Sequence, residues 1–232
     1  MPEPAPSQAN VSGSGPKGFF VTGTDTGVGK THVALALVRG LVRSGKRIAA
    51  MKPVAAGAAR TPDGLRNDDA LQLASVANVS APYETRNPFC FELPASPHIA
   101  AEQAGIVIDP AVICRKFEEL TALADAVVVE GAGGWLAPIS RTRTMEEVAQ
   151  ALRLPVLLVV GLRLGCLNHA LLTARAVRAS GLPLISWVAN EIDPRFEQSA
   201  ENVALLSAAL GPPLAVVPAS CTAAETTIPV SL

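Results

Sequence analysis

One run of residues in this 232-residue chain combines glycines, a lysine and a threonine at a spacing that could bind phosphate. Residues 23–31 read GTDTGVGKT, follow the apolar stretch 19–21 and precede a helical pattern. Glycines let backbone N–H groups turn toward an anion without Cβ clashes, and a helix N-terminus adds partial positive charge. Lys30 could reach the β- and γ-phosphates of a nucleotide, and Thr31 could place its hydroxyl on Mg²⁺.

The loop departs from the strict phosphate-loop pattern in one respect. That pattern has four residues between its two glycines. Here five residues separate Gly23 from Gly29, so Thr24 stands where the strict pattern has glycine. We interpret the loop as a variant branch of the nucleotide-binding class. The alternative is a glycine-rich turn without a ligand, and Gly-Lys-Thr directly after a strand argues against it.

Three further strand ends carry polar side chains that could complete a site with this loop. Lys52 ends an apolar strand and would point toward the same crevice as Lys30. Glu130 ends a β-branched strand, the usual second Mg²⁺ position beside a phosphate loop. Asn190 could pair with adenine through a donor and an acceptor together. The plainer explanations are a surface lysine, a capping acid and an asparagine satisfying its own turn.

Three stretches outside the loop could also bind ligands. Residues 131–134 (GAGG) would let backbone N–H groups approach another anion. In residues 61–70 a turn precedes a helix start, where Asp69 is either a metal ligand or a cap favoured by the helix dipole. Residues 161–170 run from a strand into a helix whose free N–H groups could hold a carboxylate, and His169 in that run is more readily structural than catalytic.

The elements that must position these residues alternate between strand-like and helix-like segments. Several strand candidates are runs of β-branched residues without alternation, as expected for strands covered on both faces. This rhythm predicts an α/β fold, namely a P-loop NTPase-like, doubly wound and mostly parallel β-sheet with helices on both faces. Ligands in such sheets bind at the C-terminal ends of the strands. Strands are expected at residues 19–23, 47–52, 126–130, 156–160, 184–190 and 214–217, and helices at 30–43, 67–77, 110–123, 145–152, 168–180 and 195–210.

Composition narrows the class of protein. Apolar residues make up 49% and charged residues 17%, enough for a large core in one domain, and the net charge of −1 gives no sign of a nucleic-acid surface. The longest apolar run, residues 154–162, is too short to span a membrane. The four cysteines form no C-x-x-C pair and suit a reducing compartment. We expect a cytoplasmic protein without nucleic-acid or membrane partners, with a disordered leader at residues 1–16 and a single domain at 17–232.

Together these stretches closely resemble dethiobiotin synthetase, the ATP-dependent cyclo-ligase family of biotin synthesis. The resemblance implies a P-loop homodimer that uses 7,8-diaminononanoate, CO₂ and MgATP. One amine would take up CO₂ as a carbamate, and ATP would phosphorylate that carbamate to a mixed carbamic–phosphoric anhydride. The second amine would then close the ureido ring and expel phosphate. The matching stretches, in order along the chain, are residues 20–31, 52–55, 61–70, 96–99, 130–135, 159–170 and 187–190.

The resemblance also implies a role for each matching residue. Lys30 would contact the phosphates, and Lys52 would be the active-site lysine near the carbamate. The Mg²⁺-associated positions would be Thr31, Asp69 and Glu130. The nucleotide contacts would be Gly27, Val28, Gly29, Lys30, Thr31, Asp69, Glu130, Gly131, Ala132, Gly133, Asn190, Glu191, Pro218, Ala219, Ser220 and Glu225. The substrate contacts would be Ala56, Leu164, Gly165 and Asn168, the last three at a site for the distal carboxylate across the dimer interface.

This chain departs from the family pattern at four places. Gly27 stands where many members have Glu, which would remove a carboxylate contact to the nucleotide or metal. Ala56 replaces a frequent Ser against the substrate, and one lost hydrogen bond costs about 1 kcal/mol. Glu191 replaces a common Asp, and residues 218–220 (PAS) replace a Pro-Trp-Leu type of stretch. The last change would loosen the preference for adenine.

Three other functions remain open. Another ATP-dependent amidoligase on the same fold would share the loop but lack the substrate stretch at residues 164–169. A P-loop partitioning or regulatory ATPase would carry an additional lysine early in the loop, where residues 24–26 are Thr, Asp and Thr. A nucleotide-binding module that has lost catalysis would bind ATP without turnover, and Gly27 and Ala56 are compatible with it.

Overall fold

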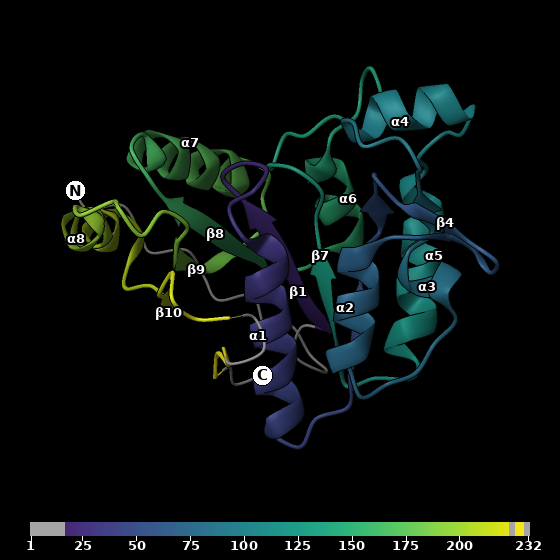
Figure 1. The fold of residues 1–232 in the computed structure, drawn as a ribbon, viewed down its shortest axis with the longest axis horizontal. Coiled ribbons are helices and arrows are strands. Elements are labelled where there is room, and N and C mark those ends of the chain that lie inside the picture. Colours follow the sequence, from purple (N-terminus) through teal and green to yellow (C-terminus); the bar gives the residue numbers. More distant parts are fainter. Residues whose placement is uncertain (1–16, 223–225, 230–232) are drawn as a thin grey trace, which may run out of the picture.

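A six-stranded parallel sheet forms the centre of the computed structural model, which describes residues 17–222 and 226–229 (Figure 1). Its order is β10-β9-β8-β1-β7-β2, so β1 lies between β7 and β8. The predicted mostly parallel sheet is therefore confirmed. The expected leader at residues 1–16 and the candidate Glu225 lie outside the described residues. The strands are β1 (Gly18–Gly23), β2 (Ile48–Met51), β7 (Ala126–Glu130), β8 (Val156–Leu162), β9 (Leu184–Glu191) and β10 (Ala215–Val217).

Helices cover both faces of this sheet. Successive residues of a strand point to opposite faces, and here the side chains on both faces are apolar and must be buried. Val128 shares a buried cluster with Leu37, whereas Val127 and Val129 belong to a second cluster with Phe117 on the other face. In Figure 1, α1 lies in front of β1. On the face of Val128 lie α1 (Lys30–Arg43) and α2 (Asp68–Val76), and on the other lie α5 (Pro110–Thr121), α6 (Met145–Leu152), α7 (Cys166–Ala179) and α8 (Ser199–Leu210).

The predicted helices and central strands are present, with ends that differ by a few residues. The largest difference is at α8, which begins at Ser199 rather than 195, and no other predicted end differs by more than two residues. In the part of the chain that the structure describes, no helix is long and apolar enough to cross a bilayer.

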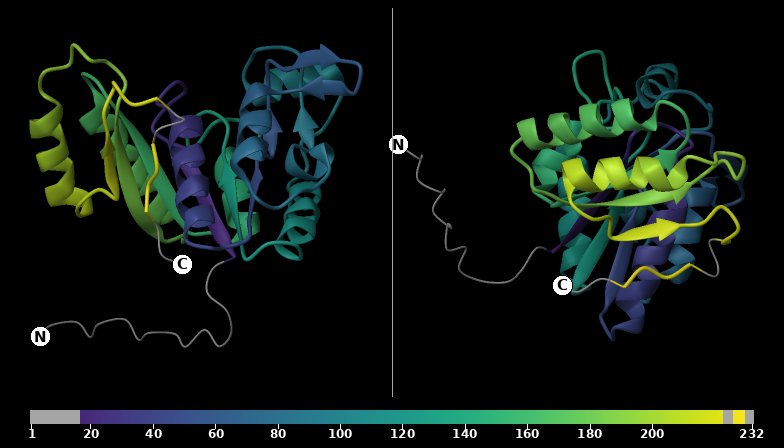
Figure 2. Two further views of the ribbon diagram at one scale, coloured as in Figure 1. Left: turned by 60° about the horizontal axis from the view of Figure 1, so that its bottom comes forward. Right: turned by 90° about the vertical axis from the view of Figure 1, so that its left-hand side faces the viewer.

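The chain between β2 and α5 contains short elements that the sequence pattern did not indicate. β3 pairs with β6 in parallel, and β4 pairs with β5 as an antiparallel hairpin. Figure 2 shows this region, coloured blue, at the end of the molecule opposite α8 and β10. These elements have two to eight residues, and most are too short for hydrophobic periodicity to reveal. They are β3 (Val54–Ala55), β4 (Ala59–Thr61), β5 (Gly64–Arg66), α3 (Tyr83–Arg86), β6 (Phe89–Cys90) and α4 (Pro97–Ala104).

Candidate functional site

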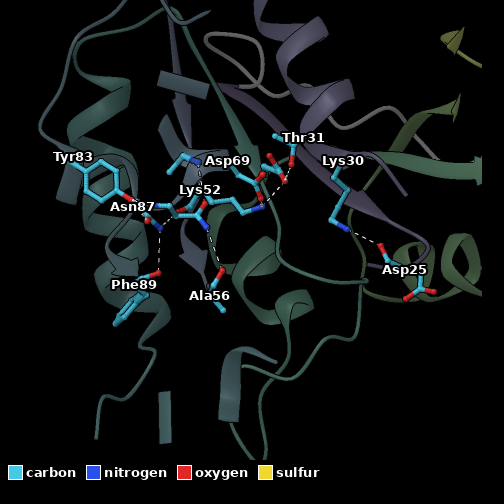
Figure 3. Close-up of polar contacts among 12 residues, drawn as sticks. Asp25, Lys30, Thr31, Lys52, Ala56, Asp69, Tyr83, Asn87 and Phe89 are labelled. Carbon is cyan, nitrogen blue, oxygen red and sulfur yellow. Dashed lines mark hydrogen bonds and ion pairs between the residues drawn. The ribbon is translucent and has the colours of Figure 1, made fainter. Parts of the chain in front are cut away.

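The C-terminal ends of β1, β2 and β7 open into a cavity of about 760 Å³. This is the edge of a parallel sheet where ligands bind in doubly wound folds. Polar side chains come to it from the loop after β1, from the residue after β2, from the first turn of α2 and from the end of β7 (Figure 3). The predicted residues that meet here are Lys30, Thr31, Lys52, Asp69 and Glu130.

The loop between β1 and α1 has the backbone conformation that anion binding needs. Gly27 and Gly29 have φ of 75° and 84°, the left-handed region that glycine adopts without strain. Gly29 is the N-cap residue of α1, so the first N–H groups of that helix are available to a ligand. The predicted strand, loop and helix are present, and the two glycines have the positive φ that lets backbone N–H groups turn toward an anion.

Lys30 is buried at the start of α1, and its charge is only partly compensated. Its Nζ donates to the carbonyl oxygen of Asp25 at 2.8 Å, and the residue is 7% exposed. Burial, helped by the charge of Lys52, lowers the pKa of Lys30 to about 8. The carboxylate of Asp25 is itself paired with Arg163 at 2.6 Å. Lys30 therefore has a pKa only slightly above neutral pH, and a bound anion would stabilise its charged form.

Lys52 is the centre of an ionic cluster in which Lys52 and Glu130 are buried and Asp69 is partly exposed. Its Nζ lies 2.5 Å from Oε1 of Glu130 and 3.0 Å from Oδ2 of Asp69. Burial would lower the pKa of Lys52, but the two carboxylates outweigh that effect and raise it, so the side chain is an ammonium at neutral pH. Lys52 is 6% exposed and Glu130 1%, which rules out the plainer explanation of a surface lysine.

Glu130 has one oxygen that the protein leaves without a partner. Oε1 accepts from Lys52 and from the hydroxyl of Thr31 at 2.9 Å, whereas the buried Oε2 has no hydrogen-bond partner among the described residues. A buried oxygen without a hydrogen-bond partner lowers the stability of the protein unless a bound ligand or metal ion contacts it. Among the described residues no group of three or more His, Cys, Asp or Glu side chains could hold a metal. Two carboxylates and a hydroxyl suit Mg²⁺, which usually keeps waters and phosphate oxygens as its other ligands.

Other predicted residues lie in or just behind the cavity wall. Gly27, Gly29, Ala56, Ala132 and Gly133 line the cavity, whereas Val28 and Gly131 are buried beside it. Asn190 lies behind the loop, where its Nδ2 donates to the carbonyl oxygen of Val28 at 2.9 Å.

The remaining predicted residues lie away from this cavity in the single chain. The backbone N–H of Ala219 donates to Oε2 of Glu191 at 3.4 Å. Ala219 is exposed and Glu191 is half-buried. Leu164 is 90% exposed. The residues that the cavity does not bring together with the lysines are Leu164, Gly165, Asn168, Glu191, Pro218, Ala219 and Ser220.

Several cavity residues were not named as site residues from the sequence. Asn67 is the clearest case: it is buried, its side chain caps α2 by accepting from the N–H of Ala70 at 3.2 Å, and its amide reaches the carbonyl oxygen of Ala56 at 3.4 Å. An Asn directly before two Asp residues is a recognisable N-cap signal. The others lining the cavity are Thr26, Val54, Ala55, Pro94, Ala95, Ser96, Pro97, Gly134, Ala137 and Pro138.

Comparison with known proteins agrees with this geometry. A family profile described as an AAA domain matches residues 17–222. A protein of Xanthomonas oryzae pv. oryzae named ATP-dependent dethiobiotin synthetase BioD is 48% identical over 198 residues, which are 85% of this chain and 88% of that protein. A protein of Vibrio vulnificus with the same name is 49% identical over 197 residues, 85% of this chain and 87% of that protein.

Solved structures with the same fold are more distant in sequence. The signal recognition particle receptor FtsY from Elizabethkingia anophelis has a TM-score of 0.53 at 15% identity, covering 93% of this chain and 63% of that chain. The Signal Recognition Particle 54 kDa protein from Aeropyrum pernix, solved in complex with GDP, has a TM-score of 0.53 at 18% identity, covering 90% and 43%. At these identities the likeness shows the P-loop α/β fold alone.

Proposed function

The chain belongs to the family of ATP-dependent dethiobiotin synthetases, and on this premise we propose that it closes the ureido ring of dethiobiotin from 7,8-diaminononanoate and CO₂, with MgATP as co-substrate. The observation that carries the proposal is one cavity in which Lys30 and Lys52 lie beside two carboxylates at the end of a phosphate-binding loop. Such an arrangement suits a reaction that must bring anions together.

The proposed reaction joins two anions and then expels one. A nitrogen of the diamine adds to CO₂ and loses a proton, giving a carbamate. A carbamate oxygen attacks the γ-phosphorus of ATP, and ADP leaves with the electrons of the broken bond. The second amine then attacks the carbonyl carbon of the anhydride and loses a proton to the solvent, and phosphate leaves with the electrons of the broken C–O bond as the ring closes. Phosphoryl transfer of this kind depends mainly on positioning and electrostatic stabilisation.

Each lysine would bind one of the two anions, Lys30 the phosphates of ATP and Lys52 the carbamate. The N–H groups of residues 27–31 and the ammonium of Lys30 would hold the β- and γ-phosphates. Lys30 would exchange the carbonyl oxygen of Asp25, now 2.8 Å away, for a phosphate oxygen. Lys52, held as a cation by its carboxylate neighbours, would hold the carbamate oxygens against the γ-phosphate.

Thr31, Asp69 and Glu130 would hold Mg²⁺, and the unpartnered Oε2 of Glu130 supports this assignment. When bound, the ion would neutralise charge on the phosphoryl oxygens during transfer. In the protein itself, Lys52 donates to both carboxylates, so the cation proposed for the carbamate and the proposed metal ligands are held in one hydrogen-bonded group.

The predicted residues outside the cavity fit a second part of the proposal. We infer that the protein is a cytoplasmic homodimer in which Leu164, Gly165 and Asn168 of the second copy hold the distal carboxylate of the substrate. The 90% exposure of Leu164 and a helix N-terminus after Gly165 that no side chain caps support this placement. Adenine would lie along Asn190 and Glu191, toward residues 218–220.

Product mass spectrometry after incubation with MgATP, bicarbonate and 7,8-diaminononanoate tests the proposal, with ADP release followed in parallel. We expect dethiobiotin and ADP in a one-to-one ratio. ATP binding without dethiobiotin would reject the proposed function. It would favour a related amidoligase if another diamine supports ADP release, or a silent nucleotide-binding module if none does.

A further inference from the structure

A hydrogen-bonded cluster around Tyr83 lies behind the cavity and joins the chain segments that carry its catalytic groups (Figure 3). The Tyr83 hydroxyl donates to Oδ1 of Asn87 at 2.8 Å. The Asn87 amide in turn donates to the carbonyl oxygen of Lys52 at 2.6 Å and to that of Phe89 at 3.3 Å. The backbone N–H of Lys52 donates to the carbonyl oxygen of Arg86 at 2.9 Å. Both backbone polar groups of Lys52 are therefore held by the segment that contains α3.

The same hydroxyl also holds the segment that carries Asp69. Tyr83 accepts a hydrogen bond from the backbone N–H of Asn67 at 2.8 Å. Asn67 is the N-cap of α2, and Asp69 lies in the first turn of that helix. The Asn67 amide also donates to the carbonyl oxygen of Ala56 at 3.4 Å. One hydroxyl thus connects, directly or through one side chain, the three segments that bring Lys52, Ala56 and Asp69 to the cavity.

The cluster is built to be rigid. Asn87 is 2% exposed and Asn67 7%, so polar groups left unpaired there would be costly. The Arg66 guanidinium lies over the Tyr83 ring, 4.2 Å from its centre. Burial raises the pKa of Tyr83, so the phenol keeps its proton and remains a donor at neutral pH. A side chain with this many partners has one favoured position.

We propose that Tyr83 is a positioning residue for the synthetase reaction. Its hydroxyl holds Asn87 and Asn67 at a fixed separation. Through them it keeps the Lys52 ammonium and the Asp69 carboxylate in register with each other. The inference rests on the proposed function for the roles of these two groups. A displacement of about 1 Å in a positioned reacting group costs up to about 100-fold in rate, so the loss of one remote hydroxyl is enough to be measured.

Tyr83→Phe tests this inference, because it removes the hydroxyl and keeps the ring. We expect kcat to fall about 10- to 100-fold, with KM for ATP changed by less than about threefold since the phosphate loop is not touched. Thr85→Val is the matched control in the same short helix. Thr85 is buried, and its hydroxyl donates to Glu119 at 3.0 Å, on the side of α3 that faces α5. The control loses one hydrogen bond of the same helix without touching the cluster, and its kcat should be unchanged.

A second readout does not depend on activity. The side-chain NMR signal of Lys52, assigned by its loss in Lys52→Met, should shift in the ligand-free Tyr83→Phe protein and stay in place in Thr85→Val. An unshifted signal in Tyr83→Phe overturns the inference whatever the rate, and so does a normal kcat in that variant of an active enzyme. If Tyr83→Phe does not fold, Asn87→Ser is used with the same criteria.

The two proposals fail separately. If the wild type forms no dethiobiotin, the proposed function is rejected, and the Lys52 signal alone decides whether Tyr83 positions that side chain. If the wild type is active and Tyr83→Phe behaves as Thr85→Val in either measurement, the positioning role is rejected and the proposed function stands.

Discussion

ATP binding to this chain is expected to take up a proton at Lys30 above pH 8. Burial, with the charge of Lys52 added, lowers the pKa of Lys30 to about 8 from an ordinary value of 10.5. A triphosphate would bring several negative charges to the ammonium and so raise that pKa again. At pH 8 the free protein would hold about half of this lysine neutral and at pH 9 most of it, whereas the complex would hold it charged. Binding must therefore take a proton from the solvent.

The size of this effect follows from the pKa of the free protein. At pH 9 about one molecule in eleven carries the charged lysine, so the affinity for ATP should be about tenfold lower than with a fully charged site, or ~1.4 kcal/mol. Proton uptake should rise from about 0.5 at pH 8 to about 0.9 at pH 9. The nucleotide itself does not contribute, because a phosphate monoester has its second pKa near 6.

Titration calorimetry in two buffers of different ionisation enthalpy measures this uptake directly. Lys30→Arg is the control, since a guanidinium keeps its charge throughout the range and should bind without taking up a proton. Absence of net proton uptake by the wild type at pH 9 would refute the reasoning.

The lowered pKa of Lys30 also makes the free energy of unfolding of the ligand-free protein depend on pH. The folded-state pKa of Lys30 lies below the unfolded value, so the unfolded chain binds more protons between pH 8 and 10.5. Burial of the charged lysine therefore costs about 3 kcal/mol below pH 8, and this cost fades as the pH rises to 10.5.

Four substitutions test the structural and functional roles of other residues. Lys52→Met should abolish turnover and lower the free energy of unfolding by about 3–5 kcal/mol, because the buried Glu130 loses its cation. Adding Glu130→Gln should restore most of the stability in urea without restoring activity, and recovery of both together would contradict a catalytic role. Gly29→Ala should abolish ATP binding in calorimetry, since φ is 84° and a Cβ would overlap with the Asn190 amide, and normal affinity would be evidence against it. Gly40→Ala should lower Tm although alanine favours helix by about 1 kcal/mol, because a Cβ would overlap with the carbonyl oxygen of Ile228, and a higher Tm would show the reverse.

The central elements could be predicted because their signals are local. The run Val127–Val129 is buried on both faces, as its unbroken β-branched character indicates, and the phosphate loop is recognisable from nine consecutive residues. Lys52 and Glu130 could be expected at the same edge of the sheet because each ends a parallel strand. Their 2.5 Å contact could not be predicted, because it depends on β2 and β7 being neighbours, and strand order is a tertiary property.

The region between β2 and α5 could not be predicted for a different reason. β3 and β6 are two residues each and pair across a gap in sequence of more than thirty residues, so neither has a period or a turn of its own. The proposed role of Tyr83 could not be predicted either, because it also depends on contacts between segments that are distant in sequence. A lone tyrosine after a proline carries no signal for chemistry. Its importance appears only when Asn67 and Asn87, which lie far from each other in sequence, are brought to the two sides of one hydroxyl.

The balance of charge in the cavity shows why the glycine loop is needed. Lys30 and Lys52 are matched by Asp69 and Glu130, and Asp25 is matched by Arg163, so the charged side chains of this group sum to zero. Because this group has no net charge, its side chains together offer little net attraction for a nucleotide. Besides the ammonium of Lys30, the attraction must come from the N–H groups of residues 27–31 and the N-terminus of α1, which point at the ligand only while Gly27 and Gly29 keep positive φ. A substitution that moves the backbone at Gly29 should therefore reduce ATP affinity more than the neutralisation of any one carboxylate in the cavity.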